Sequence, residues 1–289
     1  MGLILKNTNG GFGRLRLSGG TGRMNVLAAT SSTPPSPTFD ADAQAFITAA
    51  AITDPTQQSA VNTLVVSLKD YSIWTKMKAL YPFVGGTASQ HKFNLKNPLD
   101  TDAAFRLVFN GGWTHSSNGA LPNGTNAYAD TKITPSLHLT LNSTHASYYS
   151  RTSGASGYAF GAMDVGQTNR ILLQLSSPIF YASVFVTTGN YYEYTGGSSL
   201  AMLTVNRNAS NVSNIWQNNI KKATSTLTPS SLTLYPIFIG ANNAAGAGAN
   251  FFSNGQCAFS SIGDGLTDTE YTNFYTAVQA FQTSLSRNV

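Results

Sequence analysis

Residues 105–124 read FRLVFNGGWTHSSNGALPNG, and this stretch decides the fold class. Asn-Gly pairs begin at Asn110, Asn118 and Asn123, with short apolar or mixed runs between them. Asn-Gly is a strong former of the tight turns that join antiparallel strands. The stretch therefore predicts short strands joined by hairpins.

The same pattern continues toward the C-terminus. Another Asn-Gly pair begins at Asn254, and Leu137, Leu139 and Leu141 alternate with polar residues, as in a half-buried strand. Further strand-like runs lie at residues 171–175, 179–187, 200–205 and 231–235. Many short strands without helices between them predict an all-β, concanavalin-like jelly-roll sandwich over residues 84–289.

A helical segment over residues 38–83 precedes the sandwich. Asp54 and Pro55 supply an N-cap and a first-turn proline, so a helix begins there. We expect two more helices, near residues 39–50 and 72–80. The apolar face of the central helix is Val61, Leu64, Val65 and Leu68. We favour a helical clamp on the sandwich, with packing against symmetry mates as the alternative.

A C-terminal helix closes the chain. Thr267 and Glu270 have the spacing of a capping box, and Leu266 and Tyr271 that of a hydrophobic staple. Its apolar face follows as Tyr271, Phe274, Val278, Phe281 and Leu285. We therefore expect an amphipathic helix packed on the sandwich.

Residues 1–37 form an arm of different composition. The arm is glycine-rich, ends in the linker SSTPPSP at residues 31–37, and holds four basic residues and no acidic one. It has too few apolar residues to fold alone. We interpret it as an extended docking arm in which Arg14, Arg16 and Arg23 lie against another subunit.

Composition excludes several classes of function. The 289 residues are 42% hydrophobic and only 10% charged, with a net charge of +5. The basic residues form no stripe beyond the arm, so nucleic-acid binding is not expected. The single cysteine, Cys257, excludes an internal disulfide and suits a small core position. No apolar run approaches the ~18 residues of a membrane span, and the apolar residues Leu3, Ile4 and Leu5 are followed at once by Lys6, so we expect no signal peptide.

The acidic residues and histidines do not form a catalytic or metal-binding pattern. Glu193 and Glu270 are the only glutamates, and Glu270 is already used as a helix cap. A glycosidase of this fold needs two carboxylates flanking the scissile bond, and Glu193 has no acidic residue two or four positions away. The four histidines are scattered without ligand spacing. We therefore expect no enzyme activity, no metal and no cofactor.

Aromatic residues are the remaining functional signal. Trp113 lies in a loop-like stretch between Asn-Gly pairs, and tyrosines cluster at two places. Exposed rings beside amides can stack on sugars or anchor subunit interfaces, whereas buried rings would belong to the core. Both interpretations stay open for the candidate contact residues, which are Trp113, Tyr148, Tyr149, Tyr191, Tyr192 and Tyr194.

The order of motifs in the chain resembles a known group of proteins. The runs are AFRLVFNGG at 104–112, AMLTVNR at 201–207, IWQNN at 215–219, FIGA at 238–241, FSSIGDGLTDTE at 259–270 and FQTSLSR at 281–287. This order resembles laminin-G/concanavalin-like jelly rolls. The variant that ends in a helix is similar to virion proteins of tailed bacteriophages that infect Bacteroidetes. The likeness covers residues 38–289, and metal ligands of the concanavalin type are not matched.

The resemblance implies a structural function. We expect a component of a bacteriophage virion, such as a fibre, tail or capsid-decorating subunit, made in the host cytoplasm. It would contact other virion proteins through residues 1–36, form a homo-oligomer and take part in attachment to a host-surface glycan. The alternative is a carbohydrate-binding lectin module, and a polysaccharide depolymerase comes third.

Overall fold

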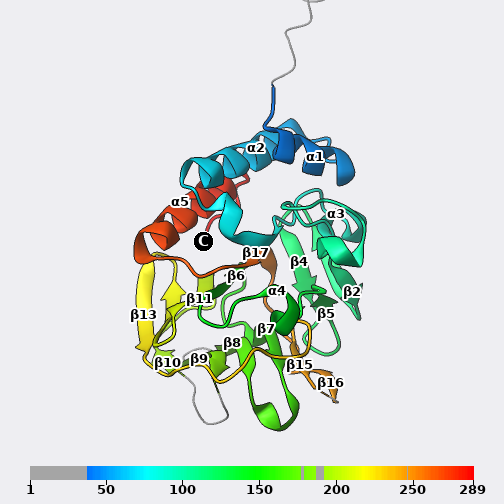
Figure 1. Cartoon of the computed structure of the whole chain (residues 1–289). Helices are drawn as coiled ribbons and strands as arrows, with labels where there is room; N and C mark the ends of the chain where they lie inside the picture. The colour runs from blue at the N-terminus through cyan, green and yellow to red at the C-terminus, as the bar shows by residue number, and fades with distance from the viewer. Residues whose placement is uncertain (1–37, 177–178, 187–191, 246) are drawn as a thin grey trace, which may run out of the picture. The chain divides into compact units, whose positions relative to one another are not determined.

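The computed structural model describes residues 38–176, 179–186, 192–245 and 247–289. Residues Phe39–Val289 form one folded unit, so the helical segment and the sandwich belong together. The arm with Arg14, Arg16 and Arg23, and also Tyr191, lies outside the described residues. Figure 1 shows the three longest helices together on one side of the strands.

The first sheet is antiparallel and joins strands from both ends of the folded unit. β17 lies between β6 on one side and β4 and β1 on the other. In spatial order its strands are β13 (Ile220–Ser225), β12 (Val212–Gln217), β11 (Ala201–Ala209), β6 (Thr144–Ser150), β17 (Cys257–Gly263), β4 (Gly119–Pro122) and β3 (Trp113–Ser116), with β1 (Met77–Tyr81) beside β17.

The second sheet lies against the first and is antiparallel except where β15 runs parallel to β7. Its order is β10 (Tyr192–Thr195), β9 (Ile179–Val186), β8 (Arg170–Ser176), β7 (Ser156–Met163), β14 (Phe238–Ile239), β5 (Tyr128–Asp130) and β2 (Val108–Asn110), with β15 (Asn242–Ala244) and β16 (Gly248–Asn250) as a side hairpin. These two sheets confirm the all-β jelly-roll sandwich.

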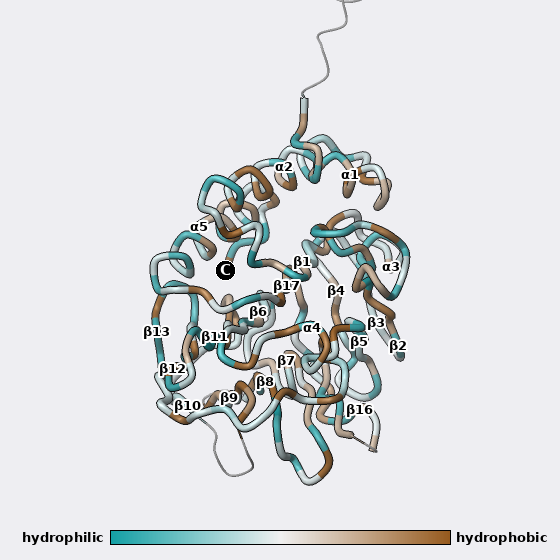
Figure 2. Tube along the Cα trace, in the orientation of Figure 1, coloured by the Kyte–Doolittle hydropathy of each residue, from teal (hydrophilic) through white to brown (hydrophobic). Residues whose placement is uncertain are grey.

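A core between the sheets is built from alternating residues. On β11, Leu203 and Val205 face this core, whereas Met202 faces the helices. The buried Cys257 belongs to the core as expected, and its burial raises the pKa of the thiol. The apolar runs of β8 and β9 are coloured brown in Figure 2 and supply much of the other wall.

A helical layer covers the outer face of the first sheet. It consists of α1 (Ala41–Ala49), α2 (Pro55–Asp70), the 3₁₀ turn η1 (Trp74–Lys76) and α5 (Asp268–Ser284). The side chain of Asp54 accepts from the backbone N–H of Gln57, and Thr267 and Glu270 form the capping box, so both predicted helix starts are confirmed. Teal and brown alternate along α2 and α5 in Figure 2, as amphipathic helices require. The helices therefore clamp the sandwich.

Three local predictions were wrong. Residues 72–80, expected as a helix, form η1 and β1, because β1 pairs with β17 and pairing outweighs local propensity. Leu137, Leu139 and Leu141 do not form a strand, because Pro135 begins the short helix α4 (Pro135–His138). Residues 231–235 lie in an irregular segment. The remaining short helices are α3 (Ala88–His91), η2 (Asp102–Ala104) and η3 (Val165–Gln167).

Candidate functional site

The two sheets end together at one side of the sandwich, where β2 and β3 are edge strands. Three half-buried rings meet there. Phe109 lies 5.3 Å from Trp113 and 4.6 Å from His115 between ring centroids, and Trp113 and His115 stack at 6.3 Å. We call these rings, with the neighbouring amides of Asn123 and Asn126, the Trp113 edge.

Trp113 is fixed by backbone groups on both sides. Its Nε1–H donates to the carbonyl oxygens of Asn110 at 3.0 Å and Tyr128 at 3.3 Å. Gly240 has a φ of 82°, and a Cβ at this position would lie 2.9 Å from the indole. Glycine is thus required for this close approach, and the indole keeps one orientation without needing a ligand.

The amides of the Trp113 edge are held in a tight turn. The Asn123 side-chain oxygen accepts from the backbone N–H groups of Thr125, Asn126 and Ala127 at 3.0, 3.1 and 3.2 Å. Asn123 Nδ2 donates to Asn126 Oδ1 at 2.8 Å, and that oxygen also accepts from the backbone of Gly112 at 3.0 Å. Asn123 and Asn126 are exposed. The turn therefore presents fixed polar groups beside the rings.

Behind the rings, His115 contacts a second histidine. The Nδ1 atoms of His91 and His115 lie 2.9 Å apart. His91 is 2% exposed, and its Nε2 has no partner among the described residues. Burial, helped by His115 and Arg287, lowers the pKa of His91 to about 3, and burial also lowers the pKa of His115. Both imidazoles are therefore neutral at pH 7.

The nearby carboxylates are engaged in ion pairs. Asp100 contacts Lys92 at 2.5 Å and Arg106 at 2.9 Å, and Asp102 contacts Arg106 at 3.0 Å. Hydrogen bonds from Lys92 and Arg106 lower the pKa of Asp100, which keeps it ionised. Carboxylates held in this way are poor proton donors for general acid catalysis.

The glutamates lie apart from this network. Glu193 is on β10 opposite Tyr181, and Glu270 bonds Lys76 at 2.6 Å beside its helix cap. Burial of Glu270 raises its pKa, but the bonds from Lys76 and Thr267 outweigh this and lower it overall. Among residues 38–176, 179–186, 192–245 and 247–289, no group of three His, Cys, Asp or Glu side chains could hold a metal ion.

Four of the predicted contact tyrosines are core residues, which corrects their assignment as glycan contacts. Tyr148 faces the core between the sheets and Tyr149 the helical layer, and both are 0% exposed. Tyr192 and Tyr194 are 6% and 8% exposed on the inner side of β10. Tyr148 and Tyr149 are both buried because the helical layer covers the outer face of β6, whereas Tyr192 and Tyr194 are buried because both point into the core between the sheets. Of the predicted ring contacts that the structure describes, only Trp113 is half-buried.

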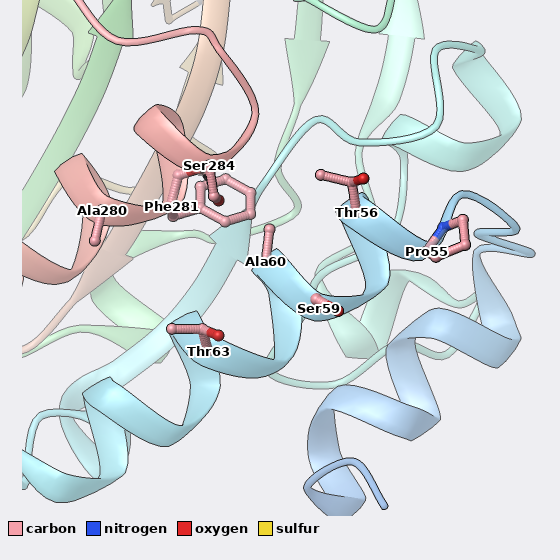
Figure 3. Close-up of a pocket in the computed structure, with 8 residues that line it drawn as sticks. All are labelled: Pro55, Thr56, Ser59, Ala60, Thr63, Ala280, Phe281 and Ser284. Atoms are coloured by element: carbon pink, nitrogen blue, oxygen red, sulfur yellow. Dashed lines mark hydrogen bonds between the residues drawn. The ribbon is translucent and has the colours of Figure 1, made fainter. Parts of the chain in front are cut away.

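A groove of about 430 Å³ lies between α2 and α5, and its lining includes no residue of the Trp113 edge. Figure 3 shows small side chains along it, including Thr56, Ser59 and Thr63 from α2 and Ala280 and Ser284 from α5. No titratable side chain lines it. The groove therefore offers no acid–base chemistry.

The helices of the described residues are all too short or too polar to span a membrane.

No known protein family matches the sequence, and no curated protein matches it. Solved structures show distant likeness. Domain 4 of the arabinanase AbnA from Geobacillus stearothermophilus, in complex with arabinotriose, is 16% identical over 69% of this chain and 98% of its own, with a TM-score of 0.40. The binding domain of botulinum neurotoxin DC, in complex with rat synaptotagmin II, is 9% identical over 72% of this chain and 53% of its own, with a TM-score of 0.49.

A third likeness is to the NanB sialidase of Streptococcus pneumoniae, which is 12% identical over 57% of this chain, with a TM-score of 0.41. This chain matches 27% of the length of that sialidase. What these proteins bind or cleave is a property of those proteins.

Proposed function

We propose that the chain is a non-enzymatic subunit of a bacteriophage particle, and that its sandwich contacts a host-surface glycan through the Trp113 edge. The observation that carries the glycan contact is the half-buried indole of Trp113, fixed by its Nε1–H bonds beside the exposed amides of Asn123 and Asn126. The placement within a virion rests on the sequence resemblance and on the basic arm.

The chemistry of the Trp113 edge suits a neutral, hydroxyl-rich ligand. Aromatic rings offer apolar faces to the C–H faces of sugars. The side-chain oxygens of Asn123 and Asn126 are used within the turn, so their amide N–H groups are the ones that can donate to hydroxyls. The turn at Asn123 is already formed, so binding would cost little ordering of the protein. The neutral imidazoles of His91 and His115 add no charge to the surface.

Glycan binding is tested by substitution at the Trp113 edge. We expect Trp113→Ala and Asn126→Ala each to weaken binding to host cells about tenfold, the loss of one good contact. Tyr71→Ala is the matched control, because Tyr71 is an aromatic residue that is 39% exposed at the end of α2, in the helical layer. Equal binding by Trp113→Ala and Tyr71→Ala would refute the contact, provided that the melting temperatures agree within a few degrees.

The absence of catalysis is tested separately. The paired state of Asp100 and Asp102 supports a non-catalytic protein. The full chain, incubated with host polysaccharide, should release no reducing ends. Turnover that disappears in Glu193→Gln would instead favour the depolymerase.

The arm distinguishes a virion subunit from a free lectin. The unit Phe39–Val289 has its own core, so a chain that starts at Phe39 should fold, with unchanged circular dichroism melting. We expect this truncated chain to bind glycan but to fail to enter the particle or its oligomer. Normal incorporation would make the arm a dispensable tail, and unfolding would place the arm in the core; either result refutes the docking arm. A full-length chain that does not enter particles would favour the lectin alternative.

A further inference from the structure

The contact between His91 and His115 constrains where their protons lie. Two nitrogen atoms 2.9 Å apart are bonded only if one carries a proton and the other a lone pair. If His115 were the donor, the neutral His91 would carry its proton on Nε2, which is buried without a partner among the described residues. An unpaired buried N–H is costly. We therefore assign His91 as the Nδ1–H donor and His115 as the acceptor, with the proton of His115 on Nε2.

This arrangement leaves no good place for a second proton. A proton added to His115 must go to Nδ1, and two N–H groups would then face each other across 2.9 Å. Moving the proton of His91 to Nε2 would relieve that clash, but it would create the unpaired buried N–H. Protonation of the pair is therefore tied to its separation.

The charges around the pair act in the same direction. The Arg287 guanidinium faces His91 and, being positive, disfavours a charged imidazole. On α3 the adjacent Lys92 is paired with Asp100, and β2 contributes the uncharged ring of Phe109. No carboxylate of the described residues forms an ion pair with either histidine. Nothing in this part of the chain would stabilise an imidazolium.

The geometry points to a pH-operated latch: acid separates His115 from His91, His115 leaves the Trp113 edge, and the edge loses its grip on glycan. His115 contacts both Phe109 and Trp113, which also contact each other, so its departure takes one packing contact from each of these two rings. His91 stays behind, held at the end of α3 against Phe83. The effect on glycan rests on the proposed function, whereas the opening of the latch does not.

The opening is measured without any glycan. Long-range ¹H–¹⁵N spectra of the full-length chain should show His91 as the Nδ1–H tautomer and His115 as the Nε2–H tautomer at neutral pH. With 5-fluorotryptophan, the ¹⁹F signal of Trp113 should shift as His115 titrates below about pH 6.5, while the buried Trp74 and Trp216 stay unchanged. His91 as the Nε2–H tautomer, or a Trp113 signal that does not move while His115 titrates, would overturn the latch.

The consequence for binding is measured with the best ligand from a panel of neutral and acidic oligosaccharides. Wild type should bind at least about tenfold more weakly at about pH 5 than at about pH 7.5, because His115 is released in acid. His91→Phe removes the donor, so its binding should change less than about twofold over the same range. His138→Phe, at a histidine on α4 outside the pair, is the control and should behave as wild type.

The two hypotheses fail separately. A ligand that binds wild type equally at both pH values refutes the latch and leaves the glycan site standing. If no oligosaccharide binds but the ¹⁹F signal of Trp113 follows His115, the glycan function is refuted and the latch stands.

Discussion

Two buried histidines of the molecule differ in how fully their ring nitrogens are bonded. Beneath the helical layer, His145 donates from Nδ1 to the Asp264 carbonyl oxygen at 2.6 Å and accepts at Nε2 from Ser261 at 3.1 Å. Asn206 likewise bonds both the N–H and the carbonyl of Leu266, at 2.8 and 2.9 Å. At the Trp113 edge, His91 is equally buried but keeps one nitrogen unpaired.

The number of hydrogen bonds that a buried group makes bears on how readily its surroundings can rearrange. A fully bonded buried group resists change, since every alternative arrangement loses bonds. A buried group with an unused nitrogen has less to lose when its neighbour moves. The bonded network of His145 and Asn206 beneath the helical layer therefore belongs to a stable frame, whereas His91 beside the Trp113 edge can respond.

The largest expected effect breaks the frame at Arg287. This buried guanidinium donates to the carbonyl oxygens of Phe83, Pro82 and Ala258 at 2.9, 3.1 and 3.1 Å. Arg287→Ala would leave them unpaired, so we expect a loss on the order of 5 kcal/mol in the free energy of unfolding, measured by urea denaturation. Arg106→Ala, which removes an exposed arginine with two ion pairs, is the control and should change the midpoint little. Equal losses would contradict the comparison.

Next in size is the contrast between two tryptophans. Trp216 is 5% exposed and stacks on Tyr271 at 4.2 Å, so Trp216→Ala should cost about 3–5 kcal/mol through the cavity it leaves. Trp113→Ala should cost about 2 kcal/mol, because its indole is only half-buried. Thermal melts compare the two. A larger loss at Trp113 would place the edge in the frame.

Acid should lower the free energy of unfolding through His145. Burial lowers the pKa of His145 to about 4, against the opposing effect of Asp264, from an ordinary value of 6.5. The unfolded chain therefore takes up a proton below pH 6.5 that the folded chain takes up only near pH 4. The contribution of His145 to the free energy of unfolding should be constant above about pH 6.5 and fall by about 3 kcal/mol between there and pH 4, and the lowered pKa of His91 adds to the total fall. Denaturation series across this range check it, and stability that rises in acid would refute it.

The smallest effect compares two buried hydroxyls. Tyr271 donates to the Asn218 carbonyl oxygen at 2.8 Å, whereas the Tyr194 hydroxyl is buried without a partner among the described residues. Tyr271→Phe should cost about 1 kcal/mol, and Tyr194→Phe should be neutral or slightly stabilising. Precise melting of both variants decides it. A clear loss for Tyr194→Phe would reveal a bond to its hydroxyl.

Features with a local cause could be predicted from the sequence. The helix starts at Asp54 and Thr267 depend on side chains that bond the backbone within three residues, and both were predicted. The Asn-Gly pairs indicated the sandwich for the same reason. The helix predicted near residues 72–80 was wrong because the partner of β1 is β17, which is far away in the sequence.

The candidate site was predicted only in part. Trp113 stood out because glycines and amides surround it in the sequence. Tyr148 and Tyr149 misled us, because adjacent residues on a strand point to opposite faces and the helical cover of the second face is a tertiary feature. His91 lies on α3 and His115 on β3, and these two elements come together only in the folded structure. No periodicity in the sequence links them.

The place of β17 has a consequence for biosynthesis. This strand joins β6 to β1 and β4, so the first sheet cannot close until residues 257–263 have left the ribosome, and α5 follows later still. Until then the apolar side chains of β1 and β6 stay uncovered in the nascent chain, because β17 is not yet there to pair with them. Pairing across such a span is slow and exposes the chain to aggregation. The first sheet therefore closes only after the late residues of this folded unit have been made, rather than strand by strand during its synthesis.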